Sequence, residues 1–177
     1  MPKDFSLHAI TNHDQERLMN LMQRIYPAAY AHFWQKESTD WYLDLCYHPD
    51  NLRRELAEAR TRYFMVSQQD QEVGILKYDY PSSPPQIAIE NAVKLHRLYL
   101  APETHGTGLA KGLMEYMEED SIAHGADRIW LEVMQKSDQA QKFYRKAGYQ
   151  KIFEYELTFE RLKPEYRGIE IWVKEIG

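Results

Sequence analysis

Several features are scarce in this 177-residue chain, and each absence excludes a class of protein. A single cysteine, Cys46, rules out an internal disulfide framework and fits a reducing compartment. No apolar run approaches the roughly 20 residues of a membrane-spanning helix, and no signal-peptide block follows Met1–Phe5. We therefore expect a cytoplasmic protein without a membrane partner.

Basic residues are not in excess either. The 22 Lys and Arg residues against 27 Asp and Glu residues give a net charge of −5, so we expect no nucleic-acid partner. The seven histidines show no metal-binding spacing such as H-E-x-x-H. We therefore expect no metal site.

Hydrophobic periodicity predicts an α/β (α+β) fold, with one domain over residues 4–175. We expect a mixed, mostly antiparallel sheet with helices on both faces and the element order β-α-α-β-β-β-α-β-α-β-β. Thr11 or Asn12 caps a first helix that Pro27 ends, and an aromatic helical stretch covers Ala28–Leu56. Pro49 restarts a helix within this stretch. The expected strands are Phe5–Ile10, Arg62–Gln68, Val73–Tyr80, Val93–Leu100, Arg128–Met134, Lys151–Phe159 and Gly168–Glu175.

A glycine-rich segment stands between the fourth strand and a long helix. Gly106 and Gly108, one residue apart, let backbone amides approach a ligand without an intervening Cβ. The helix that follows directs its first N–H groups and the positive end of its dipole at that ligand. The segment from His105 to Ala110 therefore predicts a phosphate or pyrophosphate site.

Two common nucleotide-binding patterns fit this segment poorly. A P-loop fails because Lys111 is the fifth residue after Gly106, one short of the required spacing. A dinucleotide fold would use Gly106, Gly108 and Gly112, with Glu132 about 20 residues on. Against it, five residues separate the strand from the first glycine, and too little chain follows for the rest of such a sheet.

A third interpretation explains more of the chain. The strand end Arg97–Leu100, the glycine segment and Ala140–Tyr149 resemble the GNAT superfamily of acyl-CoA-dependent N-acetyltransferases. That family carries Q/R-x-x-G-x-G/A after its fourth strand and A-x-x-F-Y-x-x-x-G-F/Y in its last helix. His105 stands where the family has Gln or Arg, and Ser137 where it often has Asn.

The resemblance implies acetyl-CoA as cosubstrate. It implies that two strands, at Leu98–Leu100 and Leu131–Met134, diverge to admit the pantetheine arm, and that Tyr144 is the general acid for the departing thiolate. The cofactor-binding residues it implies are Leu98, Tyr99, Leu100, His105, Gly106, Thr107, Gly108, Leu109, Ala110, Ser137 and Tyr144.

The proton acceptor is left open among His96, Glu90, Tyr99 and ordered water. The resemblance implies a small primary amine as acceptor, with a loose similarity to bacterial spermidine/spermine and diamine acetyltransferases. Some of the aromatic side chains between Tyr26 and Tyr47 would line its site, beside the carboxylates Glu37, Asp40 and Asp44. The alternatives are a protein or peptide N-terminal or lysine acetyltransferase, and a non-catalytic acyl-CoA-binding domain. A homodimer is compatible with the resemblance.

Overall fold

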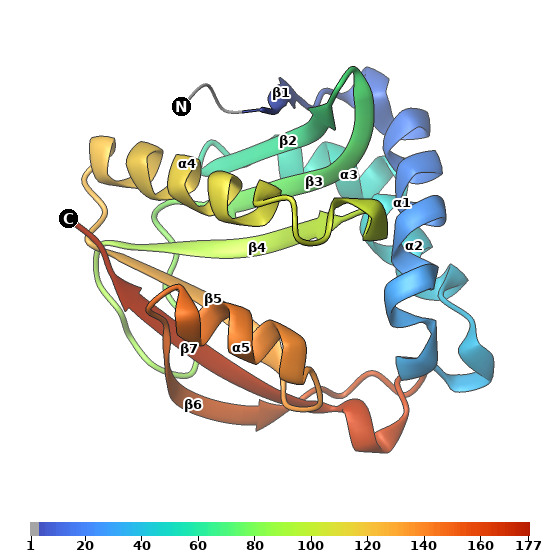
Figure 1. The fold of residues 1–177 in the computed structure, drawn as a ribbon. Coiled ribbons are helices and arrows are strands. Elements are labelled where there is room, and N and C mark those ends of the chain that lie inside the picture. Colours follow the sequence, from blue (N-terminus) through green and yellow to red (C-terminus); the bar gives the residue numbers. More distant parts are fainter. Residues whose placement is uncertain (1–3) are drawn as a thin grey trace. The chain divides into compact units, whose positions relative to one another are not determined.

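The computed structural model describes residues 4–177, whose contacts group them into two units (Figure 1). The first unit takes the chain up to Tyr78 together with Arg97–Leu113. The second takes Asp79–His96 together with Met114–Gly177. Strand β4 (Ala92–Leu100) and helix α4 (Leu109–Ala123) each contribute residues to both units. A single domain over residues 4–175 stays a prediction.

Three helices occupy the first unit, where we expected two. They are α1 (Gln15–Tyr30), α2 (Asp40–Tyr47) and α3 (Pro49–Leu56). The helix start expected at Pro49 is confirmed: His48 has an extended backbone (ψ 142°), and Pro49 is the first residue of α3.

The expectation that Pro27 ends the first helix is wrong. Pro27 lies inside α1, and the N–H of Ala31 still donates to the Pro27 carbonyl. Proline removes one helical hydrogen bond, and here that loss falls in the last turn, where the helix is about to end at Tyr30.

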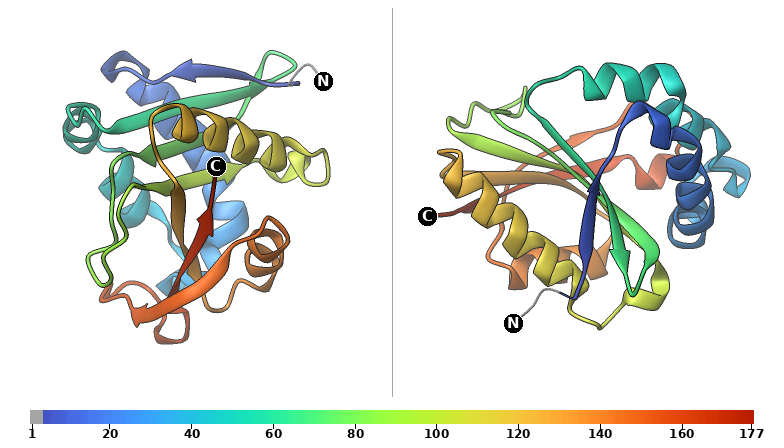
Figure 2. Two further views of the ribbon diagram at one scale, coloured as in Figure 1. Left: turned by 90° about the vertical axis from the view of Figure 1, so that its left-hand side faces the viewer. Right: turned by 90° about the horizontal axis from the view of Figure 1, so that it is seen from above.

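The strands of the first unit are β1 (Ser6–Ala9), β2 (Thr61–Gln68), β3 (Gln71–Asp79) and the end of β4, adjacent in that order. β1 pairs antiparallel with β2, from Ser6 opposite Ser67 to Ala9 opposite Phe64 (Figure 2). β2 and β3 are joined by Gln69 and Asp70, whose φ angles of 50° and 61° match a tight two-residue hairpin turn.

In the second unit the order is the start of β4, then β5 (Arg128–Met134), β7 (Gly168–Glu175) and β6 (Gln150–Glu156). β4 and β5 are parallel, and the other two pairings are antiparallel. The β4–β5 pairing covers Ala92–Leu95 against Arg128–Leu131, whereas β4 continues to Leu100 and β5 to Met134.

Both faces of this second set of strands are covered. Helix α5 (Asp138–Lys146) packs on one face, where the Arg145 guanidinium lies 5.3 Å from the Trp172 ring centroid. The other face carries Trp130, Ile171 and Ala92, and the Trp130 indole donates to the Ser82 carbonyl at 2.8 Å. The loop at Ser82 thus lies against this second face.

The expected fold class is confirmed. Seven strands form a mixed, mostly antiparallel arrangement with five α-helices among the described residues. No helix within residues 4–177 combines the length and the apolar character that crossing a bilayer requires.

Candidate active site

The glycine segment has the backbone geometry of an anion-binding turn. Gly106 and Gly108 have φ angles of +79° and +85°, in the region that a Cβ atom disfavours and glycine adopts freely. Both are exposed, and a Cβ at either would meet no atom within 4 Å. The Thr107 side chain is anchored to the preceding turn, because its hydroxyl donates to the Thr104 carbonyl at 2.7 Å. Alternating backbone angles of this kind make a concave set of N–H donors.

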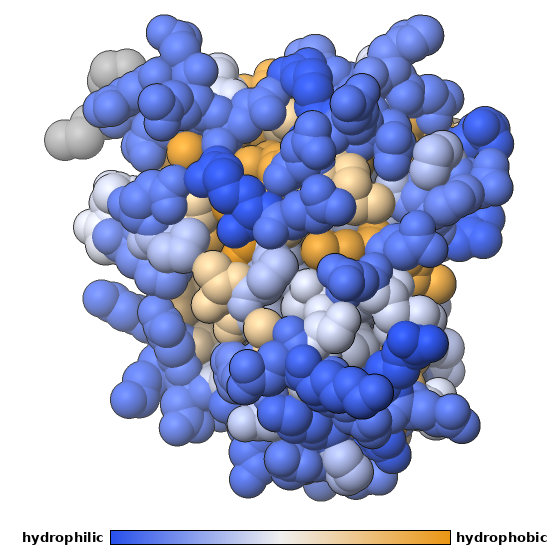
Figure 3. Space-filling view, turned by 90° about the vertical axis from the view of Figure 1, so that its right-hand side faces the viewer, coloured by the Kyte–Doolittle hydropathy of each residue, from blue (hydrophilic) through white to orange (hydrophobic). Residues whose placement is uncertain are grey.

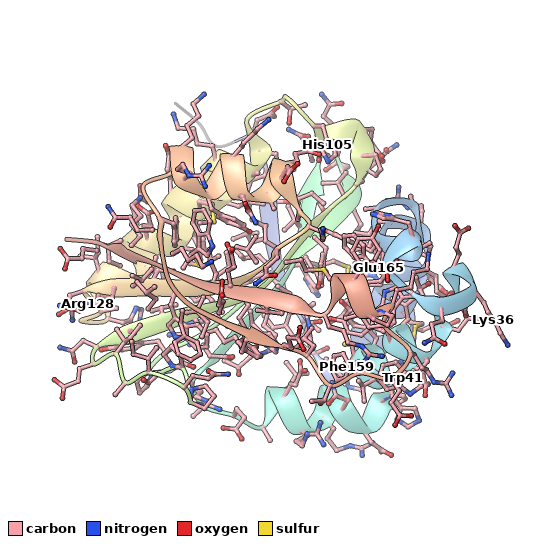
Figure 4. The ribbon with its side chains drawn as sticks, turned by 90° about the horizontal axis from the view of Figure 1, so that it is seen from below. Lys36, Trp41, His105, Arg128, Phe159 and Glu165 are labelled. Carbon is pink, nitrogen blue, oxygen red and sulfur yellow. The ribbon has the colours of Figure 1, made fainter. Side chains whose placement is uncertain are left out.

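Helix α4 begins directly after this turn. Its first hydrogen bond inside the helix runs from Gly112 N–H to the Gly108 carbonyl, at 3.0 Å. The N–H groups of the preceding turn have no helical acceptor, which is the general property of a helix start. The Leu109 N–H makes only a long contact of 3.4 Å with the Thr107 hydroxyl. His105, labelled in Figure 4, lies exposed on the loop just before.

The end of β4 that leads into this loop packs unusually closely on β3. A Cβ on Gly74 would lie 2.3 Å from the Tyr99 carbonyl oxygen and 2.5 Å from a Leu100 methyl carbon. The Ala101 N–H also donates to the Val73 carbonyl at 2.7 Å. Gly74 therefore permits the close approach of β3 to Tyr99 and Leu100, two of the residues expected to bind pantetheine. We did not predict this role, although a glycine within an apolar strand is a signal of close backbone approach.

Tyr99 belongs to a group of aromatic side chains in the first unit, which we call the tyrosine cluster: Tyr26, Trp34, Tyr42 and Tyr99. The Tyr42 and Tyr99 hydroxyls lie 3.5 Å apart, and the Trp34 indole donates to the Tyr26 hydroxyl at 3.3 Å. Tyr26 stacks on Tyr42 at 5.1 Å and meets Tyr99 edge-on at 5.4 Å.

Burial gives the tyrosine cluster its electrostatic character. It raises the pKa of Tyr99, of Tyr42 and of Tyr26 above that of an ordinary phenol. All three are therefore neutral at pH 7 and act as hydrogen-bonding phenols. This argues against Tyr99 as the proton acceptor.

The rest of the aromatic stretch divides by exposure. Phe33 and Tyr47 are buried, while Tyr30 and Trp41 (labelled in Figure 4) are partly exposed. On the face seen in Figure 3, hydrophilic residues predominate, and pale or apolar ones show between them. The carboxylate-bearing residues of this stretch are all exposed: Glu37, Asp40 and Asp44.

A buried ion pair joins helix α3 to β4 within the same unit. The Arg97 guanidinium donates to both carboxylate oxygens of Glu55, at 2.7 Å and 2.9 Å, and its residue is only 6% exposed. It also lies 5.4 Å from the Tyr47 ring centroid and 5.8 Å from that of Tyr63. We did not predict this pair, because its partners lie 42 residues apart.

The second unit holds two of the three side chains expected as proton acceptor. His96 lies within β4, and its Nδ1 is 3.8 Å from Oδ2 of the buried Asp79 at the end of β3. Glu90 is exposed just before β4 begins. Glu90 lies in the turn before β4, and the extended strand from Ala92 to His96 alone spans roughly 13 Å.

Tyr144 lies within α5, and Ser137 lies at its start. Ser137 is the N-cap residue, and its carbonyl accepts the first helical hydrogen bond, from the Gln141 N–H at 3.0 Å. The Tyr144 ring is partly exposed and meets the rings of Phe143 and Tyr149 edge-on, at 5.2 Å and 5.7 Å.

Neither metal chemistry nor thiol chemistry is indicated by the side chains. In residues 4–177 no group of three or more His, Cys, Asp or Glu residues is placed to hold a metal ion. Cys46 is buried, and burial raises the pKa of its thiol, which disfavours the nucleophilic thiolate.

Sequence comparison gives a family and one set of relatives. The model of the acetyltransferase (GNAT) family matches residues 16–149. An uncharacterized N-acetyltransferase of Mycobacterium bovis is 47% identical over 57 residues, which are 32% of this chain and 36% of that protein. The match thus spans about a third of the length of this curated relative.

Structural comparison gives the same fold at low identity. The PaiA N-acetyltransferase of Thermoplasma acidophilum, solved with coenzyme A, has a TM-score of 0.72 at 17% identity, over 97% of this chain and 98% of that one. The spermidine N-acetyltransferase of Vibrio cholerae, solved with CoA and spermine, has a TM-score of 0.68 at 18% identity, over 98% and 96%. With the family model covering most of its length, the chain belongs to the acetyltransferase (GNAT) family.

Proposed function

We propose that this protein transfers an acetyl group from acetyl-CoA to a small primary amine, with polyamines among the acceptors. The observation that carries the proposal is the exposed turn at the start of α4, where Gly106 and Gly108 both adopt positive φ. Such a turn suits a diphosphate, and in a member of this family the diphosphate is that of coenzyme A. The N–H groups of Gly106, Gly108, Leu109 and Ala110 would hold it, with His105 beside them. The Thr107 N–H instead donates to the Thr104 carbonyl at 3.2 Å.

The reaction needs two proton transfers besides the binding of the cosubstrate. The neutral amine nitrogen attacks the thioester carbonyl carbon, the C–S bond breaks, and the thiolate leaves. The amine loses a proton, and the thiolate gains one. Backbone N–H groups of the β4 end, Leu98–Leu100, would polarise the carbonyl and bind the pantetheine amides.

Tyr144 is the proposed donor of the proton to the thiolate, and the family motif around it supports this assignment. Replacing the phenol in Tyr144→Phe should reduce kcat by roughly 10²–10⁴-fold, as for other general acids. Calorimetry should give an unchanged affinity for CoA, because the ring is retained. A kcat near that of the wild type would contradict the role.

His96 is the proposed proton acceptor. It is preferred to Tyr99, whose burial keeps it neutral, and to Glu90, which lies at the opposite end of β4 from Leu98–Leu100. A neutral imidazole is the usual side chain for such a transfer near neutral pH. His96→Ala should lower kcat at saturating acetyl-CoA while leaving CoA binding intact.

The proposed acceptor class is supported by two features of the first unit. Partly exposed rings at Tyr30 and Trp41 offer faces to an ammonium group. The exposed carboxylates Glu37, Asp40 and Asp44 are available to a second cationic group. The spermine bound by the Vibrio cholerae neighbour is of this chemical class.

A thiol-release assay with acetyl-CoA and a panel of acceptors tests the proposal. Turnover with spermidine, spermine, putrescine or a monoamine, exceeding that with peptides, is the expected result. Turnover restricted to peptide amines would indicate protein acetylation instead. Tight CoA binding without turnover on any amine would indicate a non-catalytic acyl-CoA-binding domain.

A further inference from the structure

We infer that Asp79 is a positioning residue for His96, whose imidazole it holds with the proton on Nδ1 so that Nε2 faces the amine as an acceptor. The inference rests on the proposed function, in which His96 takes the proton of the attacking amine. It adds a residue that the sequence motifs do not indicate.

The geometry between the two side chains sets the direction of the effect. Asp79 Oδ2 lies 3.8 Å from His96 Nδ1, so the carboxylate faces the Nδ1 side of the ring. An ionised carboxylate can only accept a hydrogen bond, so it favours the tautomer with the proton on the nitrogen that faces it. The 3.8 Å separation exceeds a hydrogen bond, and such contacts commonly shorten when the substrate complex forms.

The exposure of the two groups suits their roles. The Asp79 residue is 7% exposed, whereas the His96 side chain is 32% exposed. The buried carboxylate is thus kept from bulk water, which would otherwise weaken its pull on the imidazole. The imidazole retains enough open surface to meet a small amine.

Other histidine–carboxylate pairs in the described chain lack this combination. In each of them the histidine side chain is about half exposed and the partners lie at most six residues apart, so the pair stabilises only a local turn or helix end: His8–Asp14, His48–Asp50 and His124–Asp120. The His96–Asp79 pair instead joins two strands 17 positions apart, which places the acid by the sheet and not by the local backbone.

The tautomer can be measured directly in the free protein. Imidazole ¹⁵N shifts and long-range ¹H–¹⁵N correlations at about pH 9, well above the ordinary pKa of imidazole, distinguish the two neutral forms. The His96 signals are assigned by their loss in His96→Gln. We expect the proton on Nδ1 in the wild type and a shift toward Nε2–H in Asp79→Asn, whose amide can donate to Nδ1.

Kinetics then connect the tautomer with turnover. Asp79→Asn should lower kcat at least tenfold and leave the KM for acetyl-CoA within about twofold, and Asp79→Glu should recover most of the activity together with the Nδ1–H form. Asp120→Asn, which removes the carboxylate beside His124, is the matched control and should change neither quantity. Circular dichroism confirms that each variant is folded.

Two results would overturn the inference: a wild-type His96 protonated on Nε2, or an Asp79→Asn variant with unchanged tautomer and kcat. Failure of the proposed function is a separate observation, namely a His96→Ala variant with undiminished kcat. The tautomer measurement needs neither an acceptor amine nor acetyl-CoA, so it judges the positioning contact even if the substrate class is different.

Discussion

Two regions of the first unit, one in β4 and one just after it in the chain, differ in burial and in the groups that they present. The glycine turn from His105 to Gly108 is exposed and presents main-chain groups. The ion pair of Arg97 with Glu55 is buried and depends on side chains from distant parts of the chain. The contrast shows that a main-chain site is encoded locally, whereas a buried side-chain pair is encoded by the fold.

The two regions also fail differently when they are altered. An exposed turn can relax, so a substitution there costs ligand affinity more than folding free energy. A buried guanidinium that loses its carboxylate stays in a low-dielectric environment without compensation, so the cost falls on stability. Substitutions in each region, assayed for both unfolding and CoA binding, make the contrast quantitative.

The largest expected effect is on the buried pair. Glu55→Ala should lower the free energy of unfolding by about 3–5 kcal/mol, because it leaves Arg97 buried without its carboxylate. Urea denaturation monitored by tryptophan fluorescence measures this loss. Glu58→Gln is the matched control on the same stretch, since Glu58 is exposed in a 3.6 Å pair with Arg60, and it should change the stability by less than about 1 kcal/mol.

A double substitution separates a lost partner from a lost interaction. Replacing the pair by apolar residues in Glu55→Leu with Arg97→Met removes both charges, so the double variant should be clearly more stable than Glu55→Ala. A double variant as unstable as the single one would mean that packing around Tyr47 and Tyr63, and not the orphaned charge, dominates the cost.

The fold class could be predicted from the sequence, because apolar periodicity sets strands and helices over most of the chain. The glycine turn could be predicted as well, because glycine is the residue that adopts positive φ without strain, as Gly106 and Gly108 do. Helix boundaries were less uniformly predictable. The start of a helix at Pro49 could be predicted from the proline, whereas Pro27 falls in a last turn that tolerates it and does not end its helix.

Side-chain contacts between distant parts of the chain could not be predicted at all. Glu55 with Arg97, and Asp79 with His96, are brought together only after strands and helices have packed. Gly74 is an intermediate case, since its residue type signals close packing but not that Tyr99 is the neighbour. Strand alternation also could not decide which of His96 and Arg97 is buried, because that depends on the elements that cover each face.

The next largest effect is expected at Gly74 in β3. This glycine packs against the end of β4, which lies between Arg97 and the glycine turn in the chain. Gly74→Ala would place its Cβ 2.3 Å from the Tyr99 carbonyl oxygen and 3.2 Å from the Leu100 Cα, which are backbone atoms of the neighbouring strand and cannot rotate away. We expect a loss of about 1–3 kcal/mol in unfolding free energy, together with weaker CoA binding by calorimetry.

Gly112→Ala provides the comparison for that variant. Its Cβ would approach only the Phe5 ring edge, at 3.2 Å, and alanine favours a helix over glycine. A change within about 1 kcal/mol in either direction is expected. Equal losses in the two variants would refute the idea that backbone proximity makes Gly74 special.

A substitution in the glycine turn should show the opposite balance. Gly108→Ala forces a residue with φ of +85° into a conformation that costs about 1–2 kcal/mol, and the open turn can escape by changing its shape. The affinity for CoA should then fall about tenfold or more, with little change in unfolding. Gly125→Ala, at φ +90° beyond the other end of α4, should cost stability without altering CoA affinity.

The smallest effect is expected at Asp14. Its carboxylate is buried, as the ion pair of Arg97 with Glu55 is, but its partners are close in the sequence, as in the glycine turn. Asp14 accepts hydrogen bonds from Thr11 N–H and the Thr11 hydroxyl, at 2.8 Å and 2.9 Å. Burial alone would raise the pKa of Asp14, but these bonds and the nearby His8 outweigh it and lower the pKa to about 2.

A lowered carboxyl pKa stabilises the fold only while the group is ionised. The contribution of Asp14 is therefore complete above the ordinary aspartate pKa of 3.8 and is lost as the pH falls from there through about 2. Asp14→Asn should cost about 0.5–2 kcal/mol at pH 7, typical of a helix cap, and the gap to the wild type should close near pH 2. Urea denaturation at both pH values measures it, with Asp44→Asn as the exposed control. If the difference in unfolding free energy persists at pH 2, it comes from the shape and hydrogen bonding of the side chain and not from its charge. Asp14 would then resemble the buried pair of Arg97 and Glu55 more than the locally encoded turn.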